Sequence, residues 1–597
     1  MCGIIGYIGN NIPNENKIEE SLDSIKHRGP DNASFLKINE NVVLGHTRLS
    51  IIDLDVRSNQ PMVNNDHTIV FNGEIFNFKE LKGRLVELGY SFNTDSDTEV
   101  LLNSYIEWGE KCVDKFNGMW AFCIYDKIKN KAFISRDRFG IKPFKYFCND
   151  NELIFASEAK AIFPLTKLKF QPNSKKIVNF IKESEGCFGR ETWFDKIYSL
   201  EPGHNLIYKD GKLFKNKYYD LIHNDSKSIN ENFYFEFLNS VKRRLISDVP
   251  IGFTLSSGID SSSIVNAAND LIENINTYTS SFESSDSEHE IVDKFTHDLK
   301  INRNFVLENF SNTVAIEKLV YHLESGHGSP AIFPLFSLYD KIKKDGIKVV
   351  LEGQGADELL AGYISANYLA YVLHQVKNFK FFNLIRLFKS KRDFSYKEAL
   401  IKFMRVSLPY KLRDFSFILR HGFVFEKSKS FTSREIRRYR STGDYFKNFI
   451  RRQHSETLTS LLHYGDAISM SCSIESRLPF MDINLVEFCN SLPNESLVGY
   501  YNSKFVGKLI MRNSMLNKLP SYILENKKLG YPTPVKSLLN SEWAKEVLDN
   551  IYFLKKYKIL NNIFLGKIKF NRGSIDPNLL YRVLITEVWF KRFYLYR

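Results

Sequence analysis

Short hydrophobic runs separated by polar turn residues fill residues 2–200 of the chain. Gly, Asn and Asp lie between the runs, as is typical of turns between strands. The runs with the length of β-strands are 42–44, 68–71, 120–125, 132–134 and 153–155. Helical spacing of hydrophobic residues is found near 18–24 and 79–88. The pattern predicts a domain of two sheets flanked by helices.

The hydrophobic pattern changes character after about residue 230. An amphipathic helix is predicted at 233–244, and the helix that follows the first strand at 261–271. The predicted strands are 251–255, 278–282 and 348–351, with helical sequence between them. Strands that alternate with helices favour a doubly wound parallel sheet covered by helices on both faces.

These changes divide the chain into two domains. We expect the first over residues 2–210 and the second over 230–597, joined by the polar, Lys-containing segment 210–229. Within the second domain, residues from about 366 to 452 are predicted to form a basic helical insertion with solvated faces. Two domains agree with a length of 597 residues, because one domain usually takes roughly 100–200.

The composition is that of a folded globular protein, with 43% hydrophobic and 25% charged residues. The net charge of +13 raises the question of nucleic-acid binding. Lys, Asn, Ile and Phe are abundant throughout, so we attribute the charge to the general composition of the chain and not to a basic patch. We therefore expect no nucleic-acid partner. No run approaches the ~20 apolar residues that cross a bilayer, and the N-terminus lacks a signal-peptide pattern. We therefore expect a cytoplasmic protein without a membrane partner.

Cys2 is a candidate nucleophile because it follows the initiator methionine. Removal of Met1 would give Cys2 both a thiol and a free α-amino group, whose pKa is about 7.7–8.0. The neutral amine could then take the thiol proton. A second-position cysteine can also be inert, so this signal depends on the motifs that follow it. The other cysteines show no CxxC spacing, which indicates neither a disulfide framework nor a zinc site.

Six motifs follow Cys2 in order along the first domain. They are His27-Arg28-Gly29-Pro30-Asp31, Gly45-His46-Thr47-Arg48-Leu49-Ser50-Ile51-Ile52-Asp53, Phe71-Asn72-Gly73-Glu74-Ile75-Phe76-Asn77, Ser96-Asp97-Thr98-Glu99, Asn117-Gly118-Met119-Trp120-Ala121-Phe122 and Arg136-Asp137-Arg138-Phe139-Gly140-Ile141-Lys142-Pro143. With Cys2 they closely resemble the glutaminase domain of class II glutamine amidotransferases, over nearly all of residues 2–200. The resemblance implies a four-layer αββα N-terminal-nucleophile fold that hydrolyses glutamine at Cys2.

Free glutamine presents a carboxylate, an ammonium and a side-chain amide, and each needs a partner. Arg48 can clamp the carboxylate, and Glu74 and Asp97 supply negative charge for the ammonium. The Asn72 amide and the Gly73 N–H are suitable donors to an oxyanion. The resemblance implies a glutamine pocket formed by Arg48, Leu49, Ser50, Ile51, Ile52, Asn72, Gly73, Glu74 and Asp97. Taken singly, Asn72-Gly73 is also a common hairpin turn, Arg48 a surface cation and Asp97 a helix cap.

The second domain carries a candidate phosphate-binding turn between a strand and a helix. The segment is Val249-Pro250-Ile251-Gly252-Phe253-Thr254-Leu255-Ser256-Ser257-Gly258-Ile259-Asp260-Ser261-Ser262. Small residues and a helix N-terminus suit an anion, and the turn resembles the SGGxDS loop of ATP pyrophosphatases. Ser257 replaces the family's first glycine, which would cost roughly 1–2 kcal/mol if the position needs positive φ. An ordinary serine-rich helix cap is the alternative.

A second glycine turn, within residues 348–363, follows a predicted buried strand and contains Asp357. Parallel sheets bind ligands at the carboxyl ends of their strands, so we expect Asp260 and Asp357 to meet and bind Mg²⁺. The resemblance implies an ATP site formed by Leu255, Ser256, Ser257, Gly258, Asp260, Ser261, Ser280, Glu352 and Gly353. Many relatives have SGEGSDE where this chain has EGQGADE, which leaves the contacts of Glu352 and Gln354 open.

Four later segments, at 464–470, 475–482, 507–512 and 527–532, resemble glutamine-hydrolysing asparagine synthetases. Lys508 matches the family lysine that stabilises charge during adenylation and amide formation, although a surface lysine is the alternative. The resemblance implies ATP- and Mg²⁺-dependent amidation, with ammonia passing between the domains, aspartate as acceptor and asparagine as product. Amidation of a sugar acid or a peptide, or a non-catalytic binding role, remain alternative hypotheses. A homodimer is kept as a hypothesis.

Overall fold

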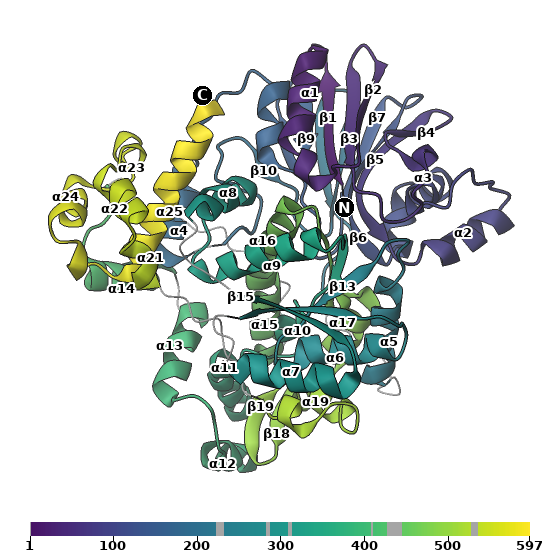
Figure 1. The fold of residues 1–597 in the computed structure, drawn as a ribbon. Helices are drawn as coiled ribbons and strands as arrows, with labels where there is room; N and C mark the ends of the chain where they lie inside the picture. Colours follow the sequence, from purple (N-terminus) through teal and green to yellow (C-terminus); the bar gives the residue numbers. More distant parts are fainter. Residues whose placement is uncertain are drawn as a thin grey trace.

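The computed structural model describes residues 2–184, 186–221, 232–281, 287–307, 313–407, 410–426, 444–526 and 535–596. Two six-stranded antiparallel sheets form the N-terminal part of the molecule, and a five-stranded parallel sheet lies in the C-terminal part (Figure 1). The mixed α/β architecture expected from the hydrophobic pattern is thereby confirmed.

The first antiparallel sheet contains β1 (Gly3–Gly9), β2 (Asn32–Asn39), β3 (Val42–Arg48), β8 (Lys145–Cys148), β9 (Glu152–Ala156) and β10 (Tyr198–Ser199). The second contains β4 (Met62–Asn64), β5 (His67–Ile75), β6 (Gly118–Asp126), β7 (Lys131–Arg136), β11 (His204–Lys209) and β12 (Lys212–Lys217). The strand orders are β10-β8-β9-β1-β3-β2 and β12-β11-β7-β6-β5-β4. All five runs predicted to be strands in this part are confirmed.

Alternation along the strands creates the four layers. In β6, Cys123 and Tyr125 lie in the core between the two sheets, whereas Phe122 and Ile124 point to the outer face. Helices α2 (Phe78–Glu87) and α3 (Asp97–Trp108) cover that outer face. Helices α1 (Glu15–Ser24) and α4 (Ser174–Glu183) cover the outer face of the first sheet. The predicted αββα order is confirmed.

The parallel sheet contains β13 (Ile251–Thr254), β14 (Asn276–Ser281), β15 (Asn302–Leu307), β16 (Val349–Leu351) and β17 (Glu475–Arg477), in the order β15-β14-β13-β16-β17. Helices α6 (Ile259–Asn269) and α7 (Ser287–Leu299) lie on one face. Helices α8 (Thr313–Leu323), α9 (Phe333–Lys344) and α16 (Thr459–Ser471) lie on the other (Figure 1). The sheet is doubly wound, and its strand order reverses between β13 and β16, where such sheets bind ligands.

The predicted insertion is helical where the structure describes it. It contains α11 (Ile364–Lys377), α12 (Phe381–Lys389), α13 (Tyr396–Ser407), α14 (Tyr410–His421) and α15 (Tyr445–Arg452). Positions 408–409 and 427–443 of the insertion lie outside the described residues. Among the helices that are described, none combines the length and the hydropathy needed to cross a membrane.

The predicted start of the linker at residue 210 is wrong. Asp210 and Gly211 form a turn with φ of 51° and 72°, and β12 then pairs antiparallel with β11. The physical reason is that Asp-Gly suits a two-residue hairpin turn in which both residues have positive φ. The lysines of β12 suit its place at the sheet edge. Residues 222–229 of the predicted linker lie outside the described residues.

Candidate active sites of the two domains

Cys2 lies directly before β1 and is fixed by its neighbours. Its N–H donates to Asn72 Oδ1 at 3.1 Å, and its carbonyl accepts from Arg28 Nε at 3.1 Å. Burial raises the pKa of the Cys2 thiol, while a hydrogen bond from the Leu49 backbone and the positive charge of Arg48 act in the opposite direction. A thiol with a raised pKa needs a base to form the nucleophilic thiolate.

Asn72 and Gly73 lie in the middle of β5, so the alternative of a hairpin turn is wrong. The Asn72 Nδ2 atom is buried and has no hydrogen-bond partner within the described part of the chain. A Cβ atom on Gly73 would lie 2.1 Å from the Met119 carbonyl oxygen. Glycine is therefore required because β6 approaches closely. The free Asn72 amide is available as a donor beside Cys2.

Buried carboxyl groups gather near Cys2. Burial raises the pKa of Glu74 well above its ordinary value and that of Asp97 to about 7. Asp97 accepts a hydrogen bond from Ile75 N–H at 2.9 Å, and Arg477 Nη2 lies 3.6 Å from Glu74 Oε1. Ser96, and not Asp97, caps helix α3. Carboxyl groups with raised pKa values favour a cation beside them, as the ammonium of glutamine would provide.

Arg48 is buried and is not a surface cation. Its Nη1 donates to Asp55 O at 2.8 Å and to Asn59 Oδ1 at 2.7 Å, and its Nη2 donates to Asp53 O. These contacts use three of the five guanidinium N–H donors. The donors left, on Nε and Nη2, have no partner among the described residues and suit a carboxylate.

The side chains that follow Arg48 do not converge on Cys2. Leu49 and Ile51 pack against Val349 and Met470 of the second domain. The Ser50 N–H donates to Asp31 Oδ2 at 2.8 Å, and the Ile52 side chain packs on the outer face of the second sheet. In this predicted segment, the backbone of Leu49 reaches the Cys2 thiol, while the apolar side chains form the domain interface.

The predicted phosphate-binding turn connects β13 to α6. Ser256 N–H donates to Ser261 Oγ at 3.0 Å, and Gly258 N–H donates to Ser256 Oγ at 3.3 Å. Ser257 N–H donates to Glu288 Oε1 at 3.2 Å, so an anionic oxygen already lies on the turn. Ser257 is not among the described residues with positive φ. The strain considered for this serine is therefore absent.

Asp260, Asp357 and Lys508 come together at the carboxyl end of the parallel sheet. Lys508 Nζ lies 2.6 Å from Asp260 Oδ2 and 2.5 Å from Asp357 Oδ1. Lys508 is only 5% exposed, so the surface-lysine alternative is wrong. Asp260 comes from α6, Asp357 from α10 (Ala356–Leu359), and Lys508 precedes α19 (Leu509–Ser514). A protein usually binds Mg²⁺ through one or two carboxylates. Asp260 and Asp357, which both contact the Lys508 ammonium, are therefore suitable Mg²⁺ ligands.

The other predicted ATP-site residues line the same strand ends. Leu255 and Ser280 are buried at the ends of β13 and β14. A Cβ atom on Gly353 would lie 3.0 Å from Asp260 Cβ, so the turn after β16 packs against the start of α6. The structure thus brings the two predicted turns into contact at the reversal of strand order.

Glu352 is held by hydrogen bonds from two hydroxyl groups. Its carboxylate accepts from Tyr339 Oη and from Ser476 Oγ, the latter at 2.8 Å. Burial raises the pKa of Glu352. Glu352, whose contacts the sequence left open, is therefore part of a packed polar site beside β17.

Two family models match the chain. The model of the glutamine amidotransferase domain matches residues 1–219, and that of asparagine synthase matches residues 235–568, more than half of the chain. The chain belongs to the asparagine synthase family. As a member, it is a glutamine-dependent, amide-forming ligase of a family that uses ATP.

Several curated relatives are similar to this asparagine synthase family member. Asparagine synthetase [glutamine-hydrolyzing] 1 of Bacillus subtilis is 28% identical, covering 99% of this chain and 96% of its own length. A putative asparagine synthetase [glutamine-hydrolyzing] 2 of Methanocaldococcus jannaschii is 33% identical, covering 61% and 76%. Amidase chry2 of Gibberella zeae is 27% identical, covering 90% and 89%.

A buried charge network joins the two domains of this asparagine synthase family member. Arg28 Nη1 donates to Glu158 Oε1 and Arg28 Nη2 to Asp466 Oδ2 in α16, each at 2.9 Å. Lys142 Nζ lies 3.7 Å from Asp466 Oδ1, and burial lowers the pKa of Lys142. Arg28, Lys142 and Asp466 lie in segments already singled out in the sequence, whereas Glu158 does not. No local pattern predicted these contacts, because the partners are remote in the chain.

Strand β17 borders both sites. The Arg477 carbonyl accepts from Glu352 N–H at 3.0 Å, while the Arg477 guanidinium donates to Glu475 Oε1 at 2.6 Å and faces Glu74. One three-residue strand therefore contacts Glu352 of the second domain and the acidic cluster near Cys2. Sequence reasoning assigned no role to Arg477 or Glu475.

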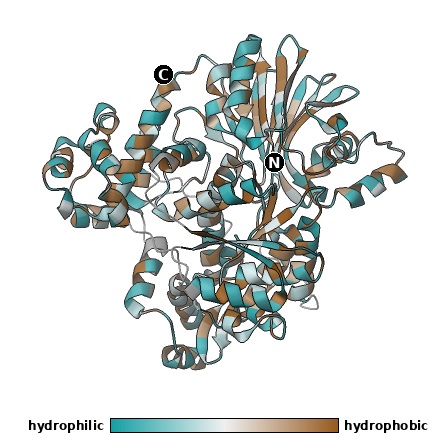
Figure 2. Ribbon diagram, in the orientation of Figure 1, coloured by the Kyte–Doolittle hydropathy of each residue, from teal (hydrophilic) through white to brown (hydrophobic). Residues whose placement is uncertain are grey.

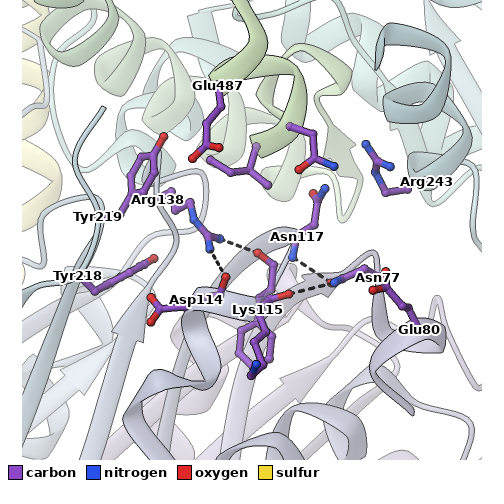
Figure 3. A pocket seen from close by; sticks show the side chains of 13 residues that line it. Asn77, Glu80, Asp114, Lys115, Asn117, Arg138, Tyr218, Tyr219, Arg243 and Glu487 are labelled. Carbon is purple, nitrogen blue, oxygen red and sulfur yellow. Dashed lines mark hydrogen bonds between the residues drawn. The ribbon is translucent and has the colours of Figure 1, made fainter. Parts of the chain in front are cut away.

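A polar cavity of about 460 Å³ opens elsewhere, at another part of the domain junction. Figure 3 shows Arg138, Asn117 and Asn77 of the first domain facing Arg243 and Glu487 of the second. None of the predicted glutamine- or ATP-binding residues lines this cavity. It is therefore distinct from both candidate active sites.

One further cluster could supply three metal ligands among the described residues, namely His27, Glu158 and His322. Glu158 is already paired with Arg28 and Lys160, so its charge is compensated without a metal. Asp260 and Asp357 remain the better candidates for Mg²⁺.

Proposed function

We propose that this enzyme forms asparagine from aspartate, glutamine and ATP. The observation that carries the proposal is that β17 contacts both a candidate glutaminase site around Cys2 and a candidate synthetase site around Lys508. The asparagine synthetases among the relatives support aspartate as the acceptor.

In the first domain, Cys2 is the proposed nucleophile once Met1 has been removed. Its own α-amino group takes the thiol proton, and the thiolate attacks the side-chain amide of glutamine. The Asn72 amide and the Gly73 N–H stabilise the oxyanion. Arg48 binds the glutamine carboxylate through its two remaining donors, while Glu74 and Asp97 bind the ammonium. Water then releases glutamate from the thioester.

In the second domain, the turn at 255–258, Ser261, Ser280, Glu352 and Gly353 are proposed to bind ATP. The aspartate carboxylate attacks the α-phosphorus, which gives an acyl-adenylate and pyrophosphate. Asp260 and Asp357 would hold Mg²⁺, which supplies charge neutralisation to the phosphates. Lys508 stabilises negative charge on the reacting groups, and ammonia displaces AMP to form the amide.

The route of ammonia is proposed to follow the domain interface along β17. Ammonia must stay out of bulk water, because at neutral pH it would be protonated to ammonium, which has no lone pair for attack. Leu49, Ile51, Val349 and Met470 form an apolar contact between the domains. Such packing supports transfer within the protein.

A different acceptor is the second candidate. The amidase among the relatives favours it, and the glutamine and ATP motifs do not specify the acceptor. Incubation with ATP, glutamine and aspartate, followed by measurement of asparagine and pyrophosphate, distinguishes the two. Glutaminase activity without asparagine formation would favour a sugar acid or a peptide as acceptor. A Cys2→Ala variant with unchanged glutamine turnover would instead favour a non-catalytic role for the fold.

A further inference from the structure

A large local excess of positive charge lies within the helical insertion of the second domain. Residues 377–440 contain 18 Lys and Arg but only five Asp and Glu, a local excess of 13 positive charges. Twelve of these cations and four of the acids lie in the described residues 377–407 and 410–426.

The same region exposes large apolar side chains on and beside α12. We define the α12 surface by its members and their exposed fractions: Phe379 (78%), Phe381 (59%), Phe382 (90%), Ile385 (54%) and Phe388 (53%). Leu384 and Leu387, on the opposite face of α12, are buried. The insertion was expected to have polar, solvated faces. Its α12 face is instead apolar, which is unusual for so many neighbouring residues of a soluble monomer.

Cations surround the α12 surface without acidic residues nearby in the sequence. No Asp or Glu occurs between Glu358 and Asp393. Lys377, Lys389 and Lys391 are exposed and make no ion pair within the described part of the chain. An exposed apolar helix face flanked by free lysines is typical of helices that lie in the plane of a membrane interface.

The position of α12 makes the surface accessible. Figure 1 shows α12 at the edge of the molecule, far from the two antiparallel sheets. Figure 2 shows hydrophobic residues along this outlying helix. A projecting helix can insert aromatic side chains into a flat surface without any rearrangement of either active site.

We propose that the α12 surface docks on a bilayer that contains anionic lipids, with α12 lying in the interface. Apolar side chains enter the headgroup boundary, and the surrounding lysines pair with lipid charge. A second copy of the chain fits less well, because it would bring two strongly cationic regions together. A nucleic acid would pair with the lysines but would not bury Phe382 and Ile385 in an apolar medium.

The test is co-sedimentation of the purified full-length enzyme with phosphatidylcholine vesicles that contain or lack phosphatidylglycerol. The expected result is binding to the anionic vesicles only, weakened by added salt. Phe382→Ser with Phe388→Ser should weaken binding by about tenfold or more. Lys389→Glu with Lys391→Glu should also weaken it by about tenfold. A wild-type melting temperature and wild-type pyrophosphate release from ATP report that the second domain of each variant is folded, since none of these residues belongs to either candidate active site.

A matched control is Phe570→Ser, which removes a phenylalanine that is 83% exposed on α24 (Asn562–Phe570). This variant should bind vesicles like the wild type. The proposal is overturned if anionic vesicles are not bound, or if the α12 variants bind them unchanged. A third outcome also overturns it: the wild type leaves vesicles unbound but binds single-stranded RNA or forms a dimer, and the α12 variants lose that RNA binding or that dimer.

Discussion

Replacement of Lys508 by methionine tests the proposed synthetase centre, because methionine preserves an apolar stem of similar length and removes the charge. The Lys508 ammonium contacts Asp260 and Asp357 at 2.6 and 2.5 Å, and the three side chains are at most 15% exposed. Removal of one partner from a buried ion pair costs about 3–5 kcal/mol. We therefore expect a lower melting temperature together with a loss of synthetase activity.

The activity loss should be about 10²- to 10³-fold in kcat, as for other groups that stabilise charge in the transition state. The assay is pyrophosphate release with aspartate, ATP and ammonium chloride, so that the glutaminase domain is bypassed. Glutaminase activity, measured in parallel, should be unchanged. Mg²⁺ should raise the melting temperature of Lys508→Met more than that of the wild type, because a bound cation can replace the ammonium between the two carboxylates.

The control is Lys344→Met, which removes a lysine whose side chain is 70% exposed and whose ion pair with Asp340 is worth little. It should leave activity and melting temperature unchanged. The reasoning is refuted if Lys508→Met keeps kcat within about tenfold of the wild type and melts at the wild-type temperature.

Three further predictions concern the glutaminase domain and its coupling to the synthetase domain. Cys2→Ala should abolish amide formation from glutamine but leave formation from ammonium salts, and loss of both would contradict the two-site scheme. Burial raises the pKa of Asp97 to about 7, so its negative charge is lost as the pH falls through that value. KM for glutamine should therefore rise on acidification. A wild-type KM that does not change across this pH range would argue against the assignment of Asp97 to ammonium binding. Arg28→Gln cuts the link between the Cys2 carbonyl and Asp466. Arg28→Gln should increase the ratio of glutamate released to amide formed, whereas the control Arg57→Gln, at an exposed position, should leave this ratio unchanged. The same ratio in both variants would show that the charge network does not couple the two sites.

The sequence by itself determined the elements and the chemistry of each separate site. Short apolar runs bounded by turn residues predicted strands such as β6, because a strand that is buried on both faces has a continuous hydrophobic sequence. The order of the motifs around Cys2, Asn72 and Gly73 indicated a glutaminase domain. The glycine turns indicated where a parallel sheet would bind phosphates.

Only the tertiary structure decided how these pieces meet. Arg28 and Asp466 are 438 positions apart, and nothing local in either motif encodes their contact. Lysines are usually exposed, so the burial of Lys508 between two carboxylates follows from packing of three distant segments. In the same way, hydrophobic spacing predicted helices in the insertion but could not say which faces would remain uncovered. Local periodicity depends on neighbours in the chain, whereas burial and charge pairing depend on which remote surfaces the fold brings together.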